Sequence, residues 1–185
     1  MNSDNILLYA KEYYQLAIME IEGIGVPKNT VSGMRRLKAI TKMWPHKGFI
    51  FEEVRFWWAV ASQKLGELYY NGVEGVMPPD PLRAHKYFMF SHAHGNKKSL
   101  IYLGLLYRQL CDVYHAAMYL KAVVDGHLED AYLAQKLLEE LKEHGFETDI
   151  PMDEYYPEED MEGYMDEDGE DEFEETTPGN FQTNA

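Results

Sequence analysis

Metal-binding and nucleophilic side chains are where chemistry would begin, and this sequence offers histidines above all. A group of five comprises His85, His92, His94, His115 and His127. His85 and His92 fall on one helix face but lie seven residues apart, whereas paired helical ligands lie four apart with an acidic neighbour. Cys111 is the only cysteine, so no cysteine pair completes a ligand set. We therefore predict no metal site.

Cys111 and His115 come nearest to a nucleophile and its base. They would approach each other if the flanking residues were helical, but no motif places an Asp or Asn to orient the histidine. A lone cysteine in a helical repeat is usually a small packing residue, and there is no Ser-x-x-Lys motif. The glycines at 23–25 and 72–75 lack the Gly-Lys-Ser/Thr ending of a phosphate-binding loop. The sequence predicts no enzyme and no cofactor; a small hydrolase is the least favoured alternative.

The elements that would position functional residues contain an internal repeat. The fullest copy has, in order, Leu65, Gly66, Tyr69, Gly72, Gly75, Val76, Asp80, Ala84, Tyr87 and Gly95. An earlier copy has Leu16, Ala17, Glu20, Gly23, Gly25, Val26, Asn29 and Gly33. A later copy has Leu103, Gly104, Tyr107, Asp112, Ala116, Tyr119 and Gly126, without the glycine loop. Repetition of this kind is typical of stacked helical units.

Each copy predicts two short helices joined by a turn. The first helix carries its glycine and, three residues later, its aromatic residue on one face, where two backbones approach closely. Asp80-Pro81 is typical of a helix start, with Asp as the N-cap and Pro in the first turn. Asn29 and Asp112 occupy the same position in the other copies. One helical hairpin of this size cannot bury its apolar face alone, so the copies have to stack.

This pattern resembles the Sel-one-like repeat (SLR) family, relatives of the tetratricopeptide repeats, and its bacterial cytoplasmic members in particular. The resemblance covers about residues 7–144. The first copy departs from the pattern at Ala17, Glu20 and Gly33, and the third copy has a shortened loop. The resemblance implies an all-α fold, a short right-handed α-solenoid of helical hairpin repeats. It also implies that the first helices line a concave face used for protein–protein interaction.

The same pattern divides the chain into a repeat domain and a tail. The domain spans 1–145, with repeats at about 7–43, 54–96 and 97–128 and a capping helix at 129–144. About eleven extra residues between the first two copies predict an insertion at 44–53, either a longer connection or, less favoured, a partner-binding loop. In the capping helix, Leu133, Leu137 and Leu141 form an apolar stripe opposite a polar face.

The register of the copies assigns residues to a core and to a binding face. The structural repeat core comprises Leu16, Leu65, Gly66, Tyr69, Ala84, Tyr87, Leu103, Gly104, Tyr107, Ala116 and Tyr119. By analogy with tetratricopeptide repeats, the inner face is formed by first-helix positions two before the leucine, one after the glycine and one after the aromatic residue. These positions include Tyr14, Gln63, Glu67, Tyr70, Ile101, Leu105 and Arg108, which we predict to contact a partner.

Charge separates the two parts of the chain. All 17 basic and 16 of the 32 acidic residues lie within 1–145, whereas 146–185 holds the other 16 acidic residues and no basic one. This second part has too little apolar surface to offset its chain entropy, so we predict a disordered acidic tail. The excess of negative charge argues against a nucleic-acid partner. No apolar run reaches the length of a membrane span.

These observations favour a non-catalytic interaction scaffold or adaptor that presents a preformed helical groove to a protein or peptide. In the alternative, the chain is an acidic decoy or regulator whose tail binds basic protein surfaces while the repeats only carry it. The single cysteine and the lack of an N-terminal signal pattern predict a reducing compartment, the cytoplasm. We expect a monomer without a membrane partner.

Overall fold

The computed structural model describes residues 3–42 and 52–148, and within these ranges the chain forms seven helices. They are α1 (Ser3–Glu22), α2 (Thr30–Thr41), α3 (Glu52–Asn71), α4 (Pro81–Ala93), α5 (Ser99–Gln109), α6 (Val113–Asp125) and α7 (Ala131–Glu143). The only β pairing among the described residues is an isolated bridge between Val73 and Met77. The predicted all-α class is confirmed for this part of the chain. Most of the predicted insertion at 44–53 and of the acidic tail at 146–185 lies outside it.

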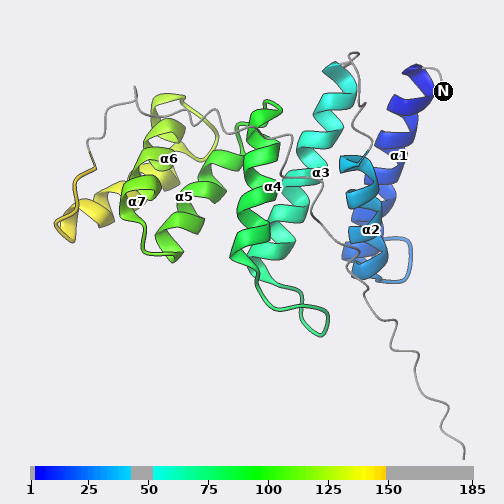
Figure 1. The fold of residues 1–185 in the computed structure, drawn as a ribbon, viewed down its shortest axis with the longest axis horizontal. Helices are drawn as coiled ribbons and strands as arrows, with labels where there is room; N and C mark the ends of the chain where they lie inside the picture. The colour runs from blue at the N-terminus through cyan, green and yellow to red at the C-terminus, as the bar shows by residue number, and fades with distance from the viewer. Residues whose placement is uncertain (1–2, 43–51, 149–185) are drawn as a thin grey trace, which may run out of the picture.

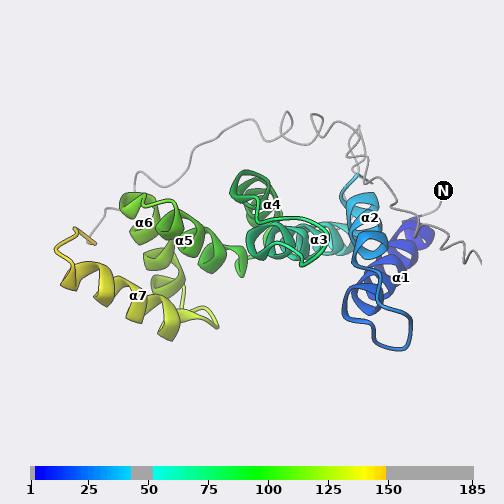
Figure 2. The same cartoon turned by 90° about the horizontal axis from the view of Figure 1, so that it is seen from below.

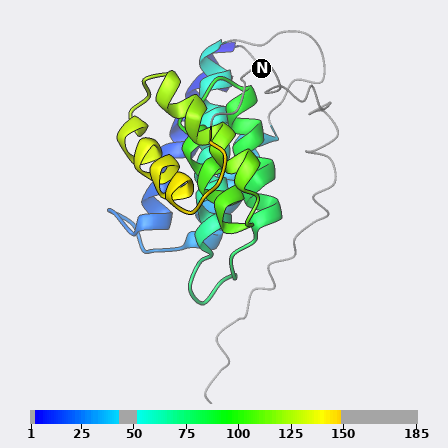
Figure 3. The ribbon, with the colours of Figure 1, turned by 90° about the vertical axis from the view of Figure 1, so that its left-hand side faces the viewer.

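The helices form one row in which each helix packs on the next (Figure 1). In addition, α1 contacts α3 and α3 contacts α5. Seen from below, α2, α4 and α6 lie on one side of the row, and α1, α3 and α5 lie on the other (Figure 2). Viewed along its length, the row stacks its helices one behind another (Figure 3). We call α1, α3 and α5 the first-helix layer, and α2, α4 and α6 the second-helix layer.

One junction joins the helices of each pair, α1–α2, α3–α4 and α5–α6. The N-cap of the second helix accepts, through its side chain, the backbone N–H three residues later. These N-caps are Asn29 (2.9 Å), Asp80 (3.0 Å) and Asp112 (3.2 Å), which confirms the predicted positions. The N–H of each N-cap also donates to a carbonyl near the end of the first helix. The donor–acceptor pairs are Asn29–Glu20 (2.7 Å), Asp80–Tyr69 (2.7 Å) and Asp112–Tyr107 (2.9 Å). The loops between the two helices differ in length from pair to pair, whereas this bond recurs in all three. The bond, and not the loop, therefore sets how the two helices of a pair come together.

Side chains also pair at this junction. In the second and third pairs two tyrosines stack with ring centroids 5.5 Å apart, Tyr69 with Tyr87 and Tyr107 with Tyr119. In the first pair the equivalent positions carry Glu20 and Arg36, whose side chains form an ion pair at 2.9 Å. The first pair therefore keeps a side-chain contact at this position, but the contact is an ion pair where the other two pairs have stacked rings.

Glycine lets the two layers approach closely in the second and third pairs. A Cβ atom on Gly66 would lie 2.6 Å from the ring of Phe88, and one on Gly104 would lie 2.8 Å from Leu120. Real Cβ contacts are not this short, so a larger residue would push the layers apart. Each glycine thus fixes the distance and the rotation of its first helix against the second-helix layer.

The first pair makes the same approach with the residue types exchanged. Ala17 stands at the glycine position of α1, and a Cβ atom on Gly33 of α2 would lie 2.7 Å from the Ala17 carbonyl oxygen. Ala17 is fully buried, whereas Leu16, which we assigned to the core, is only half-buried. That assignment needs correction because α1 begins the row, so no described helix precedes it to cover Leu16.

The remaining residues assigned to the repeat core lie between the two layers. The buried ones are Leu65, Gly66, Tyr69, Ala84, Tyr87, Leu103, Gly104, Ala116 and Tyr119, while Tyr107 is half-buried and packs on the core. At the end of the row, α7 packs on α6 through Ala134, Leu137, Leu138 and Leu141. The predicted stripe was wrong for Leu133, which is 42% exposed, because Ala134 and Leu138 beside it take the contact.

Helices α4 to α7 end in the same way, with one residue in the left-handed region. These residues are Gly95 (φ 91°), Cys111 (φ 61°), His127 (φ 49°) and Gly145 (φ 84°). The N–H of the next residue bonds back over five residues, as from Asn96 to the Ser91 carbonyl (3.1 Å) and from Leu128 to that of Val123 (3.2 Å). Gly126 of the third copy aligns with Gly95 in the sequence pattern, but its φ is −76° and the next residue, His127, takes the left-handed position.

We expect Gly66→Ala to lower the free energy of unfolding by about 2 kcal/mol, because the added methyl group overlaps the Phe88 ring. The partner substitution Phe88→Leu removes that overlap. The double variant Gly66→Ala with Phe88→Leu should therefore lose less stability than the sum of the two single variants. Urea unfolding followed by tryptophan fluorescence measures all four proteins. Strict additivity would show that the close approach is not where we place it.

His127→Gly should raise the free energy of unfolding by about 1 kcal/mol, since a left-handed conformation costs a residue with a Cβ atom about that much. His127→Ala is the matched control, because it removes the imidazole and keeps the Cβ atom. Thermal and urea unfolding should rank His127→Gly above His127→Ala. Equal stability of the two variants would contradict a left-handed residue at this helix end.

Candidate partner-binding surface

The residues predicted to contact a partner all lie on the first-helix layer. Tyr14 is on α1, Gln63, Glu67 and Tyr70 are on α3, and Ile101, Leu105 and Arg108 are on α5. Five of these seven side chains are half-buried, while Arg108 is exposed and Ile101 is buried. Tyr14, Gln63 and Glu67 lie together around the middle of this layer. The three predicted α5 residues contact other parts of the protein, described below.

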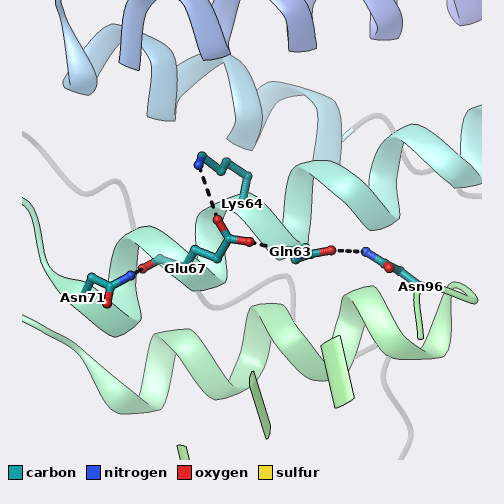
Figure 4. Close-up of polar contacts among 5 residues, drawn as sticks. All are labelled: Gln63, Lys64, Glu67, Asn71 and Asn96. Atoms are coloured by element: carbon teal, nitrogen blue, oxygen red, sulfur yellow. Dashed lines mark hydrogen bonds and ion pairs between the residues drawn. The ribbon is translucent and has the colours of Figure 1, made fainter. Parts of the chain in front are cut away.

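Glu67 is the centre of this group (Figure 4). Its Oε1 accepts a hydrogen bond from Gln63 Nε2 at 2.9 Å, and its Oε2 lies 3.3 Å from Lys64 Nζ. Gln63 in turn accepts from Asn96 Nδ2 at 2.5 Å, which ties α3 to the turn between α4 and α5. Asn71 Nδ2 donates to the Glu67 backbone carbonyl at 2.9 Å. The contacts with Gln63 and Lys64 hold the Glu67 carboxylate in one orientation on the helix surface.

Tyrosines from the two neighbouring first helices flank Glu67. Burial raises the pKa of Tyr14 above its ordinary value, and the negative charges of Glu67 and Glu22 raise it further. The pKa of Tyr102 on α5 is raised to about 12, chiefly by burial, and further by the charge of Glu67, a hydrogen bond to the Glu67 carboxylate and the charge of Asp130. One carboxylate on α3 therefore acts on side chains of both α1 and α5.

Further aromatic rings continue this surface on both sides. The ring of Tyr14 lies 5.4 Å from that of Trp57. Tyr70 and Tyr102 are joined from beneath by the buried Phe88 of α4, whose ring lies 6.5 Å from that of Tyr70 and stacks on that of Tyr102 at 5.0 Å. Trp57 and Tyr102 were not among the residues predicted to contact a partner. Tyr102 precedes the repeat leucine by one residue, where α3 has Lys64, so the register gave no signal for it.

The predicted α5 residues do not join this group. Ile101 is only 4% exposed and lines a cavity of about 150 Å³ with Val123 and Leu128, so its assignment to an open face was wrong. The reason is that α6 and the α6–α7 turn cover it. Arg108 pairs with Glu140 of α7 at 2.9 Å. Leu105 packs on the core.

His115, which was weighed as a base for Cys111, contacts Asp112 and Tyr107. His115 Nδ1 lies 2.7 Å from a carboxylate oxygen of Asp112, the N-cap of α6, and the His115 ring stacks on Tyr107 at 4.9 Å. The structure thus supplies an orienting carboxylate that no sequence motif signalled. Cys111 is exposed at the end of α5.

Among residues 3–42 and 52–148, no group of three or more His, Cys, Asp or Glu side chains is placed to hold a metal ion. None of the helices within these ranges combines the length and the apolar character that crossing a membrane requires.

We expect Tyr102 to remain protonated at about pH 11, where an ordinary tyrosine is largely ionised. Its pKa is about 12 in the folded protein and near 10 in the unfolded chain, so it contributes stability that is complete below about pH 10 and lost through about pH 12. Glu67→Gln should lower this pKa, because it removes the neighbouring negative charge. The measurement is the 13C chemical shift of the Tyr102 ring as a function of pH.

The matched control is Glu139→Gln on α7, where Gln135 Nε2 donates to Glu139 Oε1 at 3.0 Å in the same arrangement as Gln63 and Glu67. It should leave the titration of Tyr102 unchanged. Equal titration in wild type and Glu67→Gln would separate Tyr102 from the Glu67 cluster.

Comparisons with known proteins add no family to this description. No family model, no curated protein and no solved structure matches the chain. The resemblance to the SLR family therefore rests on the repeated residues, and the geometry of the first-helix layer carries the functional argument.

Proposed function

We propose that this protein is a non-catalytic interaction scaffold that binds a protein or peptide on its first-helix layer. The row of helix pairs is then a short right-handed α-solenoid of SLR-like repeats, closed by α7 and followed by an acidic tail. The shared junction of the three pairs supports this reading, since the same N–H to carbonyl bond recurs at equivalent positions. The lone thiol of Cys111 suits a cytoplasmic protein.

The observation that carries the proposal is the group around Glu67. It joins three consecutive first helices on one side of the row: Tyr14 of α1, Glu67 of α3 and Tyr102 of α5 interact electrostatically. The α3 side chains are already held by hydrogen bonds, so a partner loses little free energy in ordering them. Such a preformed surface suits recognition.

The chemistry of this surface also points to a kind of partner. Aromatic rings of Tyr14, Trp57 and Tyr70 offer flat apolar contact, and tyrosine and tryptophan are prominent in binding hot spots. The Glu67 carboxylate accepts hydrogen bonds and attracts cations. A peptide segment that combines an apolar side chain with a lysine or arginine matches both features.

Glu67→Gln tests this proposal, because it removes the charge and preserves the size of the side chain. Peptides are first selected from a random displayed library against the immobilised full-length protein. Fluorescence polarisation then measures their Kd for wild type, Glu67→Gln and Glu139→Gln. We expect about tenfold weaker binding to Glu67→Gln, or about 1.4 kcal/mol, and unchanged binding to Glu139→Gln.

Two outcomes would count against the first-helix layer as the binding surface. In the first, the selected peptides bind all three proteins equally. In the second, they are uniformly basic and are released by salt, which favours the acidic tail as the binding element.

A further inference from the structure

A cavity near the α7 end of the row plays no part in the proposed binding surface. It has a volume of about 150 Å³ and lies between the start of α5, the end of α6 and the turn between α6 and α7 (Figure 1). We call it the Ile101 cavity. Its lining residues are Lys97, Lys98, Ile101, Val123, Leu128, Glu129 and Asp130.

The interior of the Ile101 cavity is apolar and fits one small side chain. Ile101 and Val123 are 4% and 1% exposed, and Leu128 is half-buried. The four charged residues line this apolar interior with their carbon atoms, so their charged groups lie at the mouth of the cavity. An apolar cavity of about this volume accommodates a benzene molecule. An isobutyl group therefore fits inside.

The four charged residues at the mouth are not equivalent. Lys98 Nζ lies 2.7 Å from Glu129 Oε2, so these two groups neutralise each other. Within residues 3–42 and 52–148, neither Lys97 nor Asp130 forms an ion pair. Asp130 is the N-cap residue of α7, but its carboxylate accepts no hydrogen bond from the first turn of that helix. The mouth therefore offers one cation and one anion next to an apolar interior.

We propose that the Ile101 cavity binds an aliphatic α-amino acid in its zwitterionic form, with leucine as the matching size. The isobutyl group occupies the apolar interior, the carboxylate lies at Lys97 and the ammonium group lies at Asp130. A ligand with a single charge leaves one of these two residues without a partner. A small apolar cavity with a few polar groups at defined positions is the usual form of a small-molecule site. This site goes beyond the proposed function.

Asp130 also connects the cavity with the Glu67 group. Its negative charge is the smallest of the causes that raise the pKa of Tyr102, and Tyr102 is hydrogen-bonded to the Glu67 carboxylate. An ammonium group at Asp130 offsets this charge. A bound amino acid should therefore lower the pKa of Tyr102, although it does not contact the tyrosine.

Amide NMR shifts of the 15N-labelled full-length protein test this proposal. L-Leucine should shift the amides of Ile101, Val123 and Leu128 to saturation. We expect a Kd on the order of 1 mM, which one buried aliphatic side chain and two exposed charge contacts can supply. Alanine should not bind, because it leaves the cavity empty, and tryptophan should not bind, because its indole ring is too large.

Two analogues of leucine test the charges separately. Isocaproate lacks the ammonium group, and isoamylamine lacks the carboxylate. Each should bind about fivefold more weakly than leucine, because an exposed charge contact contributes about that much to affinity.

Substitutions at the cavity then assign each charge to its partner. Lys97→Gln should weaken leucine binding about fivefold and leave the affinity for isoamylamine unchanged. Asp130→Asn keeps a residue that can cap a helix, and it should weaken leucine binding equally and leave the affinity for isocaproate unchanged. Lys136→Gln, on the exposed face of α7, is the matched control and should change neither affinity. Ile101→Phe fills the cavity and should abolish binding; if it does not fold, the charge variants still decide.

Four results would overturn the proposal. Leucine that leaves the cavity amides unshifted would leave the cavity without an amino-acid ligand. Equal binding of leucine and N-acetylleucinamide would make the cavity an anchor for a peptide side chain. Leucine binding that survives both Lys97→Gln and Asp130→Asn would place the ligand elsewhere. An unchanged pKa of Tyr102 at saturating leucine would place the ammonium group away from Asp130.

Discussion

The structure depends on one hydrogen bond, from the amide of each second-helix N-cap to a carbonyl near the end of the first helix. The bond recurs in all three helix pairs, at 2.7, 2.7 and 2.9 Å, although the loops between the partners differ in length. It closes each pair at the same point, and the side chains above it pair as well. Tyr69 with Tyr87 and Glu20 with Arg36 show that this second contact tolerates a change from stacking to an ion pair.

The closure of the pairs determines which side chains reach the surface of the first-helix layer. Because Gly66 lies against the Phe88 ring, the rotation of α3 about its axis is fixed. Glu67, the next residue, is then turned toward the neighbouring first helices, where it acts on Tyr14 and Tyr102. If α3 were rotated by one residue, Glu67 would no longer face Tyr14 and Tyr102. The proposed binding surface therefore depends on the packing of the core.

The two sides of the row present different kinds of side chain. On the first-helix side, half-buried aromatic rings surround a carboxylate, which favours apolar and cationic partners. On the second-helix side, Lys38 of α2 and Arg83 of α4 lie over the buried Tyr69 ring.

The sequence by itself determined the features that depend on neighbours within one turn of the chain. The helix pairs, the N-caps at Asn29, Asp80 and Asp112 and the end of α7 shortly before Gly145 follow from local rules of capping and periodicity. The register of the copies also led to Glu67 and Gln63, because equivalent positions of one repeat share a helix face. Local periodicity does not report what covers that face.

Only the tertiary structure decided which predicted surface residues are accessible and which unpredicted ones join them. Ile101 repeats the position of Gln63, yet it is buried because α6 and the turn before α7 lie over it. Tyr102 meets Glu67, and Lys38 meets Arg83 at Tyr69, across separations of 35 and 45 residues. Such contacts arise when whole helices pack, since burial and electrostatic reach depend on distance in space, and spacing along the chain does not encode it.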